Sequence, residues 1–219
     1  METVASKQAN PCVFTDITDI VPKGSWNSED PFEQKACDID RAPFFLKARC
    51  VTHGRLCPLF AVNSDLDVAG LPCVDYSKSG KGRREEGPTA PVFCCHAKLH
   101  VEKATPLLII ENVQELSMEM IYRLYGGHYN ITRLLCDTAD VGHAGTSRSR
   151  LYLILFHKHR VVMTQDVQEM YSSIAAVLRD AIQTVPSDYI VSEPGEIDFE
   201  VQQLCITRRK QVQVTQRRV

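Results

Sequence analysis

Three groups of reactive side chains stand next to apolar runs in this sequence of 219 residues. Cys73 ends a Gly-Leu-Pro-Cys turn behind a short apolar segment, and Glu111 directly follows the run Leu-Leu-Ile-Ile. Arg148 and Arg150 lead into a third apolar segment. A thiolate is a nucleophile, a carboxyl group transfers protons, and guanidinium groups stabilise developing negative charge. Together, these residue types at strand ends indicate covalent catalysis with electrostatic support.

The elements that must position these residues alternate between strand and helix patterns, which is typical of an α/β domain. The sequence predicts strands over residues 12–21, 66–73, 105–113, 129–139 and 150–157. It predicts helices over residues 37–57, 91–102, 115–127 and 167–182, and polar loops over 22–36 and 75–89. We expect strands 66–69, 107–110 and 150–156 to be parallel and to be neighbours or near-neighbours in the sheet. Their ends then bring Cys73, Glu111 and Arg148 into one pocket.

The C-terminal part of the chain is mostly one predicted helix. Its apolar residues recur at helical spacing over 167–182, so we expect this face to pack in the core, and Pro186 to end the helix. The segment from Thr207 onward has five basic residues and no acidic one, and a solvated terminus explains it more simply than phosphate contact. We divide the chain into an N-terminal segment (1–65), a catalytic core (66–157), a helical segment (158–206) and a basic tail (207–219).

The composition is that of a globular domain, with 44% hydrophobic and 24% charged residues. A net charge of −2 provides no general attraction to nucleic acid or membranes. The apolar runs are far shorter than the roughly 20 residues of a membrane span. We see no secretion signal and expect an intracellular protein whose nine cysteines are reduced.

Two of the nine cysteines and one histidine have spacing that suits a metal, in Cys50-x-x-His53-x-x-x-Cys57. Zinc needs a fourth ligand or an open catalytic position, and Cys37 is a distant candidate for the fourth. A helical turn with buried thiols and an exposed histidine is the simpler interpretation. The sequence alone therefore predicts no metal site.

The reactive segments resemble the DNA cytosine-5 methyltransferase family. GLPCVDYS (70–77) resembles its Pro-Cys-Gln motif, although Val74 replaces the glutamine. LLIIENV (107–113) resembles its Glu-Asn-Val motif, and Glu111 follows Cys73 at a typical distance of 38 positions. RSRLYLI (148–154) is similar to its Gln-x-Arg-x-Arg motif. The resemblance covers residues 66–156 and implies an α/β, Rossmann-like sheet of an S-adenosylmethionine-dependent methyltransferase.

The resemblance also implies a role for each reactive residue. Cys73 attacks C6 of a cytosine, Glu111 protonates or hydrogen-bonds N3, and Arg148 holds O2. Arg150 supports the site or binds phosphate. The implied substrate is DNA with the target base flipped out, although the motifs fit RNA equally well. A eukaryotic member is expected in the nucleus.

Residues 77–89 stand where the family has its mobile, glycine-containing catalytic loop. The resemblance assigns nucleic-acid contacts there to five residues, which are Ser77, Lys78, Lys81, Arg83 and Arg84. Basic side chains on such a loop can contact backbone phosphates. A solvated, charged surface loop is an equally good interpretation.

The implied cofactor is S-adenosylmethionine, with Asp16 on its adenine or ribose and Pro72 beside its methyl end. However, no Phe-x-Gly-x-Gly turn precedes residue 70, and the 63 residues from 157 to the end are too few for a target-recognition region and a final motif. The predicted sheet is therefore incomplete. We expect this chain alone to bind S-adenosylmethionine weakly or not at all, because the amino-acid part of the cofactor lacks its glycine turn.

Two other functions are compatible with the sequence. One is a degenerate or truncated methyltransferase-like module that binds nucleic acid or a protein without activity. The other is a thiol enzyme of a different class, in which Cys73 would work with a histidine base. His143, in a predicted loop, is the nearest candidate for that base.

Overall fold

The computed structural model describes residues 11–59, 64–78, 80–143, 145, 147–185 and 194–207. The chain forms two compact units. The described residues up to Asp137 belong to the first unit together with Arg148–Ile174, and the second unit comprises Thr138–Ser147 and the described residues from Ala175 onward. The first unit contains the sheet that positions the reactive residues.

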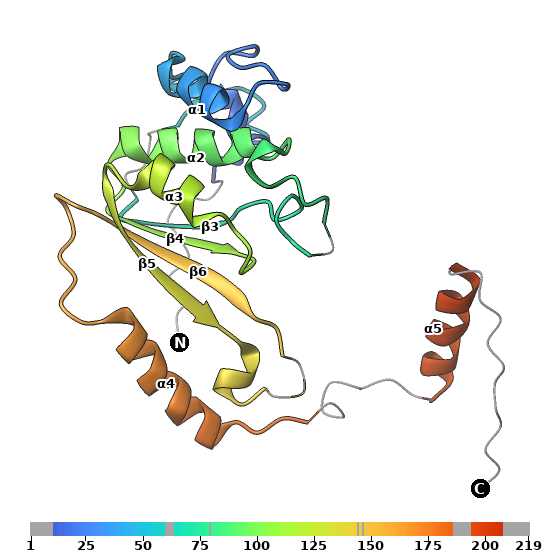
Figure 1. Ribbon diagram of the computed structural model, residues 1–219. Helices are drawn as coiled ribbons and strands as arrows, with labels where there is room; N and C mark the ends of the chain where they lie inside the picture. The colour runs from blue at the N-terminus through green and yellow to red at the C-terminus, as the bar shows by residue number, and fades with distance from the viewer. Residues whose placement is uncertain are drawn as a thin grey trace, which may run out of the picture. The chain divides into compact units, whose positions relative to one another are not determined.

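The main sheet has four strands in the order β3 (Leu66–Gly70), β4 (Leu107–Asn112), β6 (Arg150–His157) and β5 (Tyr129–Cys136) (Figure 1). β3 and β4 are parallel, whereas β6 is antiparallel to both of its neighbours. The strands β3, β4 and β5 therefore run in one direction and β6 runs in the other.

The connections explain these directions. α2 (Ala90–Lys103) links β3 to β4, and α3 (Met118–Tyr125) links β4 to β5. A helical crossover returns the chain to the same end of the sheet, which produces parallel strands. Between β5 and β6 the described residues form only the 3-10 helix η3 (Thr138–Val141). The prediction that strand 150–156 is parallel to the others is therefore wrong, and the start of β6 lies where β3 and β4 end.

Apolar residues on one face of the sheet form the core under α2 and α3. Side chains that are fully buried there include Leu108, Ile110, Leu151, Leu153 and Leu155. Phe93 of α2 and Ile121 of α3 are also fully buried and belong to the same cluster. Full burial of one such side chain contributes about 1.5–3 kcal/mol. On β3, Leu66 and Val68 are 48% and 66% exposed, so this part of the sheet is open to solvent.

The two helices of the core form where the sequence predicts them, although α3 begins three residues later than the predicted range. Pro91 stands in the first turn of α2, where its fixed φ fits and its missing N–H costs nothing. At the start of α3 the Ser117 side chain accepts a hydrogen bond from the Met120 N–H, and Gly126 follows the last residue of the helix. The predicted helices over 91–102 and 115–127 are confirmed.

The N-terminal part differs from the predictions. α1 (Phe32–Arg41) begins inside the predicted loop 22–36 and ends only five residues into the predicted helix 37–57. Pro43 disfavours helical backbone at the residue before it, so the helix stops there. The chain then forms a hairpin of β1 (Lys47–Arg49) and β2 (Leu56–Pro58). The expected helical turn around Cys50, His53 and Cys57 is thus a β-hairpin.

The predicted strand over 12–21 is also wrong. Phe14 makes a single bridge to Cys50, and the 3-10 helix η1 (Ile17–Ile20) follows. Asp16 Oδ1 accepts hydrogen bonds from both the backbone N–H and the hydroxyl of Thr18, each at 2.8 Å. Such a local side-chain bond favours a helix start over a strand.

Two helices lie near the C-terminus, α4 (Val167–Ala181) and α5 (Pro194–Thr207). The predicted helix over 167–182 is confirmed, but its predicted burial is wrong: Met170, Ile174 and Val177 are 44%, 54% and 68% exposed. Pro186 and the basic tail beyond Thr207 lie outside the described residues. Each helix in the described part of the chain is too short or too polar to cross a membrane.

A buried polar cluster joins β3 to α2. Nε2 of His96 and Nε2 of His100 lie 3.5 Å and 3.3 Å from Asp67 Oδ2. Their Nδ1 atoms lie 2.8 Å from the Tyr125 hydroxyl and 2.9 Å from the Thr105 hydroxyl. The contacts with His100 and His96 hold the pKa of Asp67 well below its usual range. Burial lowers the pKa of His96, against the opposing effect of Asp67.

This cluster predicts that the protein loses stability as the pH falls through the histidine range. The unfolded state binds a proton on His96 at a pKa of about 6.5, whereas the folded state resists it. The free energy of unfolding therefore decreases as the pH falls below about 7, with a slope of at most about 1.4 kcal/mol per pH unit. Asp67 adds a constant stabilisation in this window, because its lowered pKa matters only below about pH 4. Urea unfolding at several pH values should show this slope.

The matched variants are His96→Gln and His128→Gln. His96→Gln should flatten the slope, leaving the smaller contribution of His157, whose pKa burial also lowers. His128 is exposed, so its variant should keep the full slope. A His96→Gln protein with the wild-type slope would show that another group causes the loss of stability.

Candidate active site

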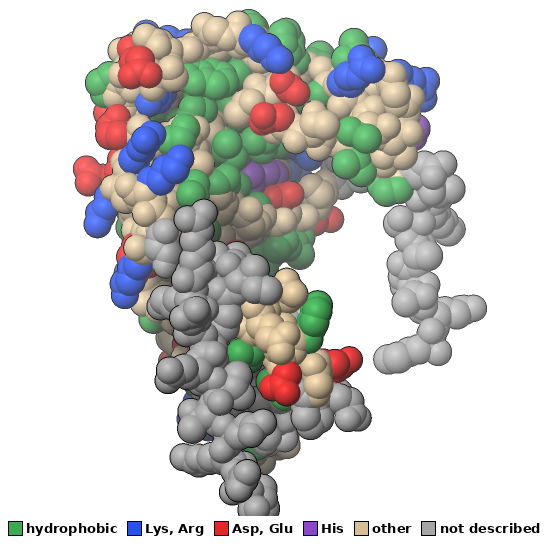
Figure 2. All heavy atoms as spheres, turned by 90° about the vertical axis from the view of Figure 1, so that its right-hand side faces the viewer, with side chains coloured by type: hydrophobic (Ala, Val, Ile, Leu, Met, Phe, Trp, Pro, Cys, Tyr) green, Lys and Arg blue, Asp and Glu red, His purple; other side chains and the backbone are tan. Residues whose placement is uncertain are grey.

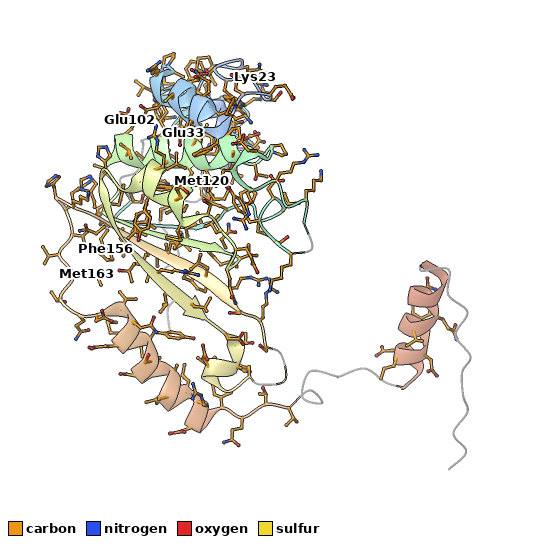
Figure 3. The ribbon with its side chains drawn as sticks, viewed as in Figure 1. Lys23, Glu33, Glu102, Met120, Phe156 and Met163 are labelled. Atoms are coloured by element: carbon orange, nitrogen blue, oxygen red, sulfur yellow. The ribbon has the colours of Figure 1, made fainter. Side chains whose placement is uncertain are left out.

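Cys73 lies on a turn that directly follows β3. Its side chain is exposed, while Leu71, two positions earlier, is buried. The carbonyl of Cys73 accepts hydrogen bonds from the backbone N–H groups of Tyr76 and Ser77, at 3.0 Å and 2.8 Å. Tyr76 is itself buried, and its hydroxyl donates to the sulfur of Met120, which lies on α3 (Figure 3). The backbone thus fixes the turn while the thiol remains accessible.

Asn112 ties this turn to the end of β4. Its side chain is 1% exposed, and its amide nitrogen donates to the carbonyl of Leu71 at 3.0 Å. Its amide oxygen accepts from the N–H of Val113 at 2.9 Å. Sequence reasoning included Asn112 only as part of a motif and assigned it no role. The structure shows that it holds the ends of the two parallel strands together.

Glu111 forms an ion pair with Arg150 at the same edge. Arg150 Nε donates to Glu111 Oε1 at 2.9 Å, with the two side chains 36% (Glu111) and 28% (Arg150) exposed. Glu111 is paired in register with Gly70, the last residue of β3. Its Oε2 lies 3.7 Å from the position that a Cβ on Gly70 would occupy. A pair this exposed adds little stability, so its main effect is to orient the carboxylate over the end of β3.

Arg148 lies at the same edge, two positions before the start of the antiparallel strand. Its side chain is exposed, and its backbone N–H donates to Asp137 Oδ1 at 3.2 Å, just beyond the end of β5. Among the predicted catalytic residues, the structure thus shows a direct contact between Glu111 and Arg150. A pocket that Cys73, Glu111 and Arg148 share stays a prediction.

The loop after the Cys73 turn is closed by a buried carboxylate. Asp75 is fully buried, and its Oδ2 accepts hydrogen bonds from the backbone N–H and the hydroxyl of Thr89 at 3.2 Å and 2.7 Å. The backbone N–H of Arg84 donates to the Asp75 carbonyl. A Cβ on Gly87 would lie 2.2 Å from the Asp75 side chain, so only glycine fits there. Sequence reasoning did not identify Asp75 as the residue that organises this loop.

The predicted nucleic-acid residues of the loop are mostly exposed. Lys81, Arg83 and Arg84 are exposed, Ser77 is half-buried, and Lys78 lies 3.4 Å from Glu115. Two acidic residues of the loop instead accept hydrogen bonds from other parts of the same chain. Glu86 accepts the N–H of Phe32 at the start of α1, and Glu85 accepts the hydroxyl of Ser117 at the start of α3. The loop therefore presents its cations to solvent, while Figure 2 shows acidic and basic side chains interspersed on the face that it draws.

A match to a family model identifies the family of this chain. The model of the C-5 cytosine-specific DNA methylase matches residues 54–216, more than half of the chain. The match spans Cys73, Glu111, Arg148 and Arg150. The chain belongs to the C-5 cytosine-specific DNA methylase family. A search of curated proteins finds no match.

Several solved structures are also similar to this chain. They include the Entamoeba histolytica methyltransferase EhMeth (19% identity, TM-score 0.35, 48% of this chain and 34% of that one) and the S. pombe Dnmt2 methyltransferase (17%, 0.36, 49% and 34%). A putative DNA modification methyltransferase from an E. coli prophage shows 20% identity and a TM-score of 0.35, over 45% of this chain and 28% of that one. This chain thus spans about a third of their lengths. With TM-scores of 0.35 and 0.36, these similarities carry no argument about the fold, which is described by the strand order given above.

The C-5 cytosine methylase family generally uses S-adenosylmethionine, but the described residues do not fit it. Asp16 is engaged as the cap of η1, and Pro72 is half-buried in the Cys73 turn. Among the residues that the structure describes, β3 pairs only with β4. No described strand with a glycine turn therefore lies beside the free edge of β3. These residues therefore provide no backbone cradle for the amino-acid part of the cofactor. Weak binding of S-adenosylmethionine remains a prediction.

Proposed function

We propose that this chain carries the base-activating site of a DNA cytosine-5 methyltransferase, with Cys73 as the nucleophile. The observation that carries this proposal is the 2.9 Å pair of Glu111 and Arg150, which lies over Gly70 at the edge that exposes Cys73. The chain's family membership supports the same chemistry. The proposal concerns activation of the base, and no step of it passes through S-adenosylmethionine.

Base activation is a covalent addition. The thiolate of Cys73 forms a bond from sulfur to C6, and the electron pair of the C5–C6 double bond shifts through the ring towards N3 and O2. Glu111, in its carboxylic-acid form, supplies a proton at N3, and Arg148 stabilises the charge at O2. C5 becomes an enamine carbon that can take up an electrophile. In water without a methyl donor, C5 takes a proton from water and then gives its original hydrogen to water as a proton. The thiolate leaves C6, the C5–C6 double bond forms again, and the proton on N3 returns to Glu111.

The target base must leave the duplex before Cys73 can reach C6. The exposed cations Lys81, Arg83 and Arg84 lie on the loop that continues from the Cys73 turn. We propose that they contact backbone phosphates when DNA binds, together with Ser77 and Lys78. RNA with an unpaired cytosine offers the same atoms to this site.

One observation favours a second candidate function. β3 is an edge strand of the main sheet, and the described residues lack a cradle for the methyl donor. A module that binds nucleic acid through the loop without modifying the base would look the same. The two functions differ in whether C5 of a bound cytosine becomes reactive.

Exchange of the C5 hydrogen separates them, because it needs no methyl donor. We expect the purified chain to release tritium from a duplex that contains cytosine labelled at C5. Cys73→Ala should abolish the release, since no other group adds to C6. Cys37→Ala, a half-buried thiol on α1, is the matched control and should retain it. DNA binding without any release supports the binding module, and release by Cys73→Ala overturns the assignment of the nucleophile.

A further inference from the structure

Four potential metal ligands meet at the hairpin of β1 and β2, away from the Cys73 turn. Cys12 lies on the segment whose Phe14 bridges Cys50, and the N–H of Val51 donates to the carbonyl of Val13 at 2.7 Å. Cys50 follows β1, Cys57 lies in β2, and His53 occupies the turn between them. The ligand atoms of the two hairpin cysteines, His53 and Cys12 all lie within 4.8 Å of one another.

The distances around His53 do not suit ordinary hydrogen bonding. Its Nδ1 lies 3.4 Å, 3.3 Å and 3.5 Å from the sulfur atoms of Cys12, Cys50 and Cys57. An imidazole nitrogen has either one hydrogen or one lone pair, so it can satisfy only one of three thiols. In tetrahedral zinc sites the bonds of about 2.3 Å to sulfur and about 2.05 Å to nitrogen place these atoms about 3.6 Å apart. The observed spacing is therefore that of ligands around a shared ion.

We propose that Cys12, Cys50, His53 and Cys57 bind one zinc ion. Three thiolates and one imidazole complete a tetrahedron, so no position remains open for water or substrate and the site is structural. Sequence spacing identified three of these residues but offered Cys37 as the fourth. The sulfur of Cys37 lies on α1, 3.8 Å from Arg123 Nη2, and the fourth ligand is Cys12.

The hairpin has little else to hold it together. Each of its strands has three residues, and only Ala48 and Cys57 are buried within them. Val51 and Leu56 are 59% and 65% exposed, and neither hairpin cysteine belongs to the main hydrophobic cluster. An isolated two-stranded hairpin is marginal in water, and a bound metal supplies folding free energy to such small units.

The family match gives the position of the site in the chain. The family match begins at residue 54, so Cys12, Cys50 and His53 precede the matched region. Three of the four ligands thus lie outside the matched region, and Cys57 lies within it. The site fastens the segment that leads into η1 onto the hairpin.

A second group with metal-like spacing, Asp67, His96 and His100, provides an internal comparison. There the Nε2 atoms of the two histidines lie 3.5 Å and 3.3 Å from one oxygen of the carboxylate, and the Nδ1 atom of each ring has a hydroxyl partner. Each ring of that group is thus oriented by a hydroxyl partner of its own, whereas the three thiols of the proposed site converge on a single nitrogen. That group also contains no sulfur, so its metal complexes differ from those of the proposed site in their spectra.

The test is metal analysis of the full chain, purified from zinc-supplemented cells under reducing conditions and dialysed against a mild chelator. We expect one zinc ion per chain. Replacement by Co²⁺ should give the visible bands of a tetrahedral ion and the near-ultraviolet charge-transfer band of thiolate ligands. Cys12→Ser should lose the ion during dialysis, while Cys12→His should keep a tetrahedral Co²⁺ spectrum with weaker thiolate bands. Cys37→Ser is the matched control and should keep both the zinc and the spectrum.

Three results would overturn the proposal. One is a folded wild-type chain without stoichiometric zinc. Another is a Co²⁺ spectrum without thiolate charge transfer, which would place the ion on Asp67, His96 and His100. The third is a disulfide between any two of Cys12, Cys50 and Cys57 in the reduced preparation.

Discussion

Replacing Glu111 by glutamine is expected to slow the C5-hydrogen exchange by about 10²–10⁴-fold, the usual contribution of a positioned acid or base. Glutamine keeps the shape of the side chain and can still donate an amide hydrogen bond to N3. It cannot transfer a proton, so negative charge accumulates on the ring when Cys73 adds to C6. Binding of the duplex should change much less than the exchange rate. The rate should be measured at saturating DNA.

The matched control for this prediction is Glu102→Gln. Glu102 is an exposed carboxylate on α2 and lies outside the proposed site (Figure 3). Its variant should exchange hydrogen at the wild-type rate. A Glu111→Gln protein that exchanges at an undiminished rate would mean that another group protonates the ring.

Replacing Arg150 by methionine is expected to slow the same exchange by about 10- to 150-fold. The figure follows from the loss of a hydrogen bond to a charged group, about 1.5–3 kcal/mol. In the structure Arg150 Nε donates to Glu111 Oε1, so Arg150 is a positioning residue that acts through the carboxylate. Arg150→Lys, which keeps the charge, should recover part of the rate. Arg133→Met removes an exposed arginine of β5 and should have no effect.

A double variant tests whether Arg150 acts through Glu111. If it does, Glu111→Gln with Arg150→Met loses no more rate than Glu111→Gln alone, because coupled residues are not additive. Losses that multiply would assign Arg150 an independent role, such as a contact to phosphate. Circular dichroism and thermal unfolding of each variant show whether the fold is retained.

Local sequence patterns were sufficient for the central strands and for the helices of the core. β4 follows from four consecutive apolar residues, and α3 from the glycine pair that ends it. The direction of β6 was wrong, although the chain contained the signal. No helix was predicted between β5 and β6, and a parallel pair needs a crossover that is usually helical. The error changed little in the site, because the start of an antiparallel strand meets the ends of parallel ones.

The N-terminal part could not be predicted from local patterns, because long-range contacts decide it. Cys12 stands 38 positions before Cys50 and reaches the hairpin through the bridge at Phe14. The β-branched residues near Ile17 favoured a strand, but the bond from Asp16 to Thr18 and packing of Ile20 in the core produce a 3-10 helix. The apolar face of α4 has the right period for a helix, yet periodicity does not show what covers it.

The central claim is that Cys73 adds to the base, and the most direct test is to locate a covalent adduct. The chain is incubated with a duplex in which 2-pyrimidinone, a more electrophilic ring without the 4-amino group, replaces the target cytosine. Denaturing mass measurement and peptide mapping then identify the modified residue. The account predicts an adduct on Cys73 alone, absent from Cys73→Ala, since Cys94 and Cys95 are buried in α2. An adduct on any other cysteine, or a bound duplex that forms no adduct, would contradict it.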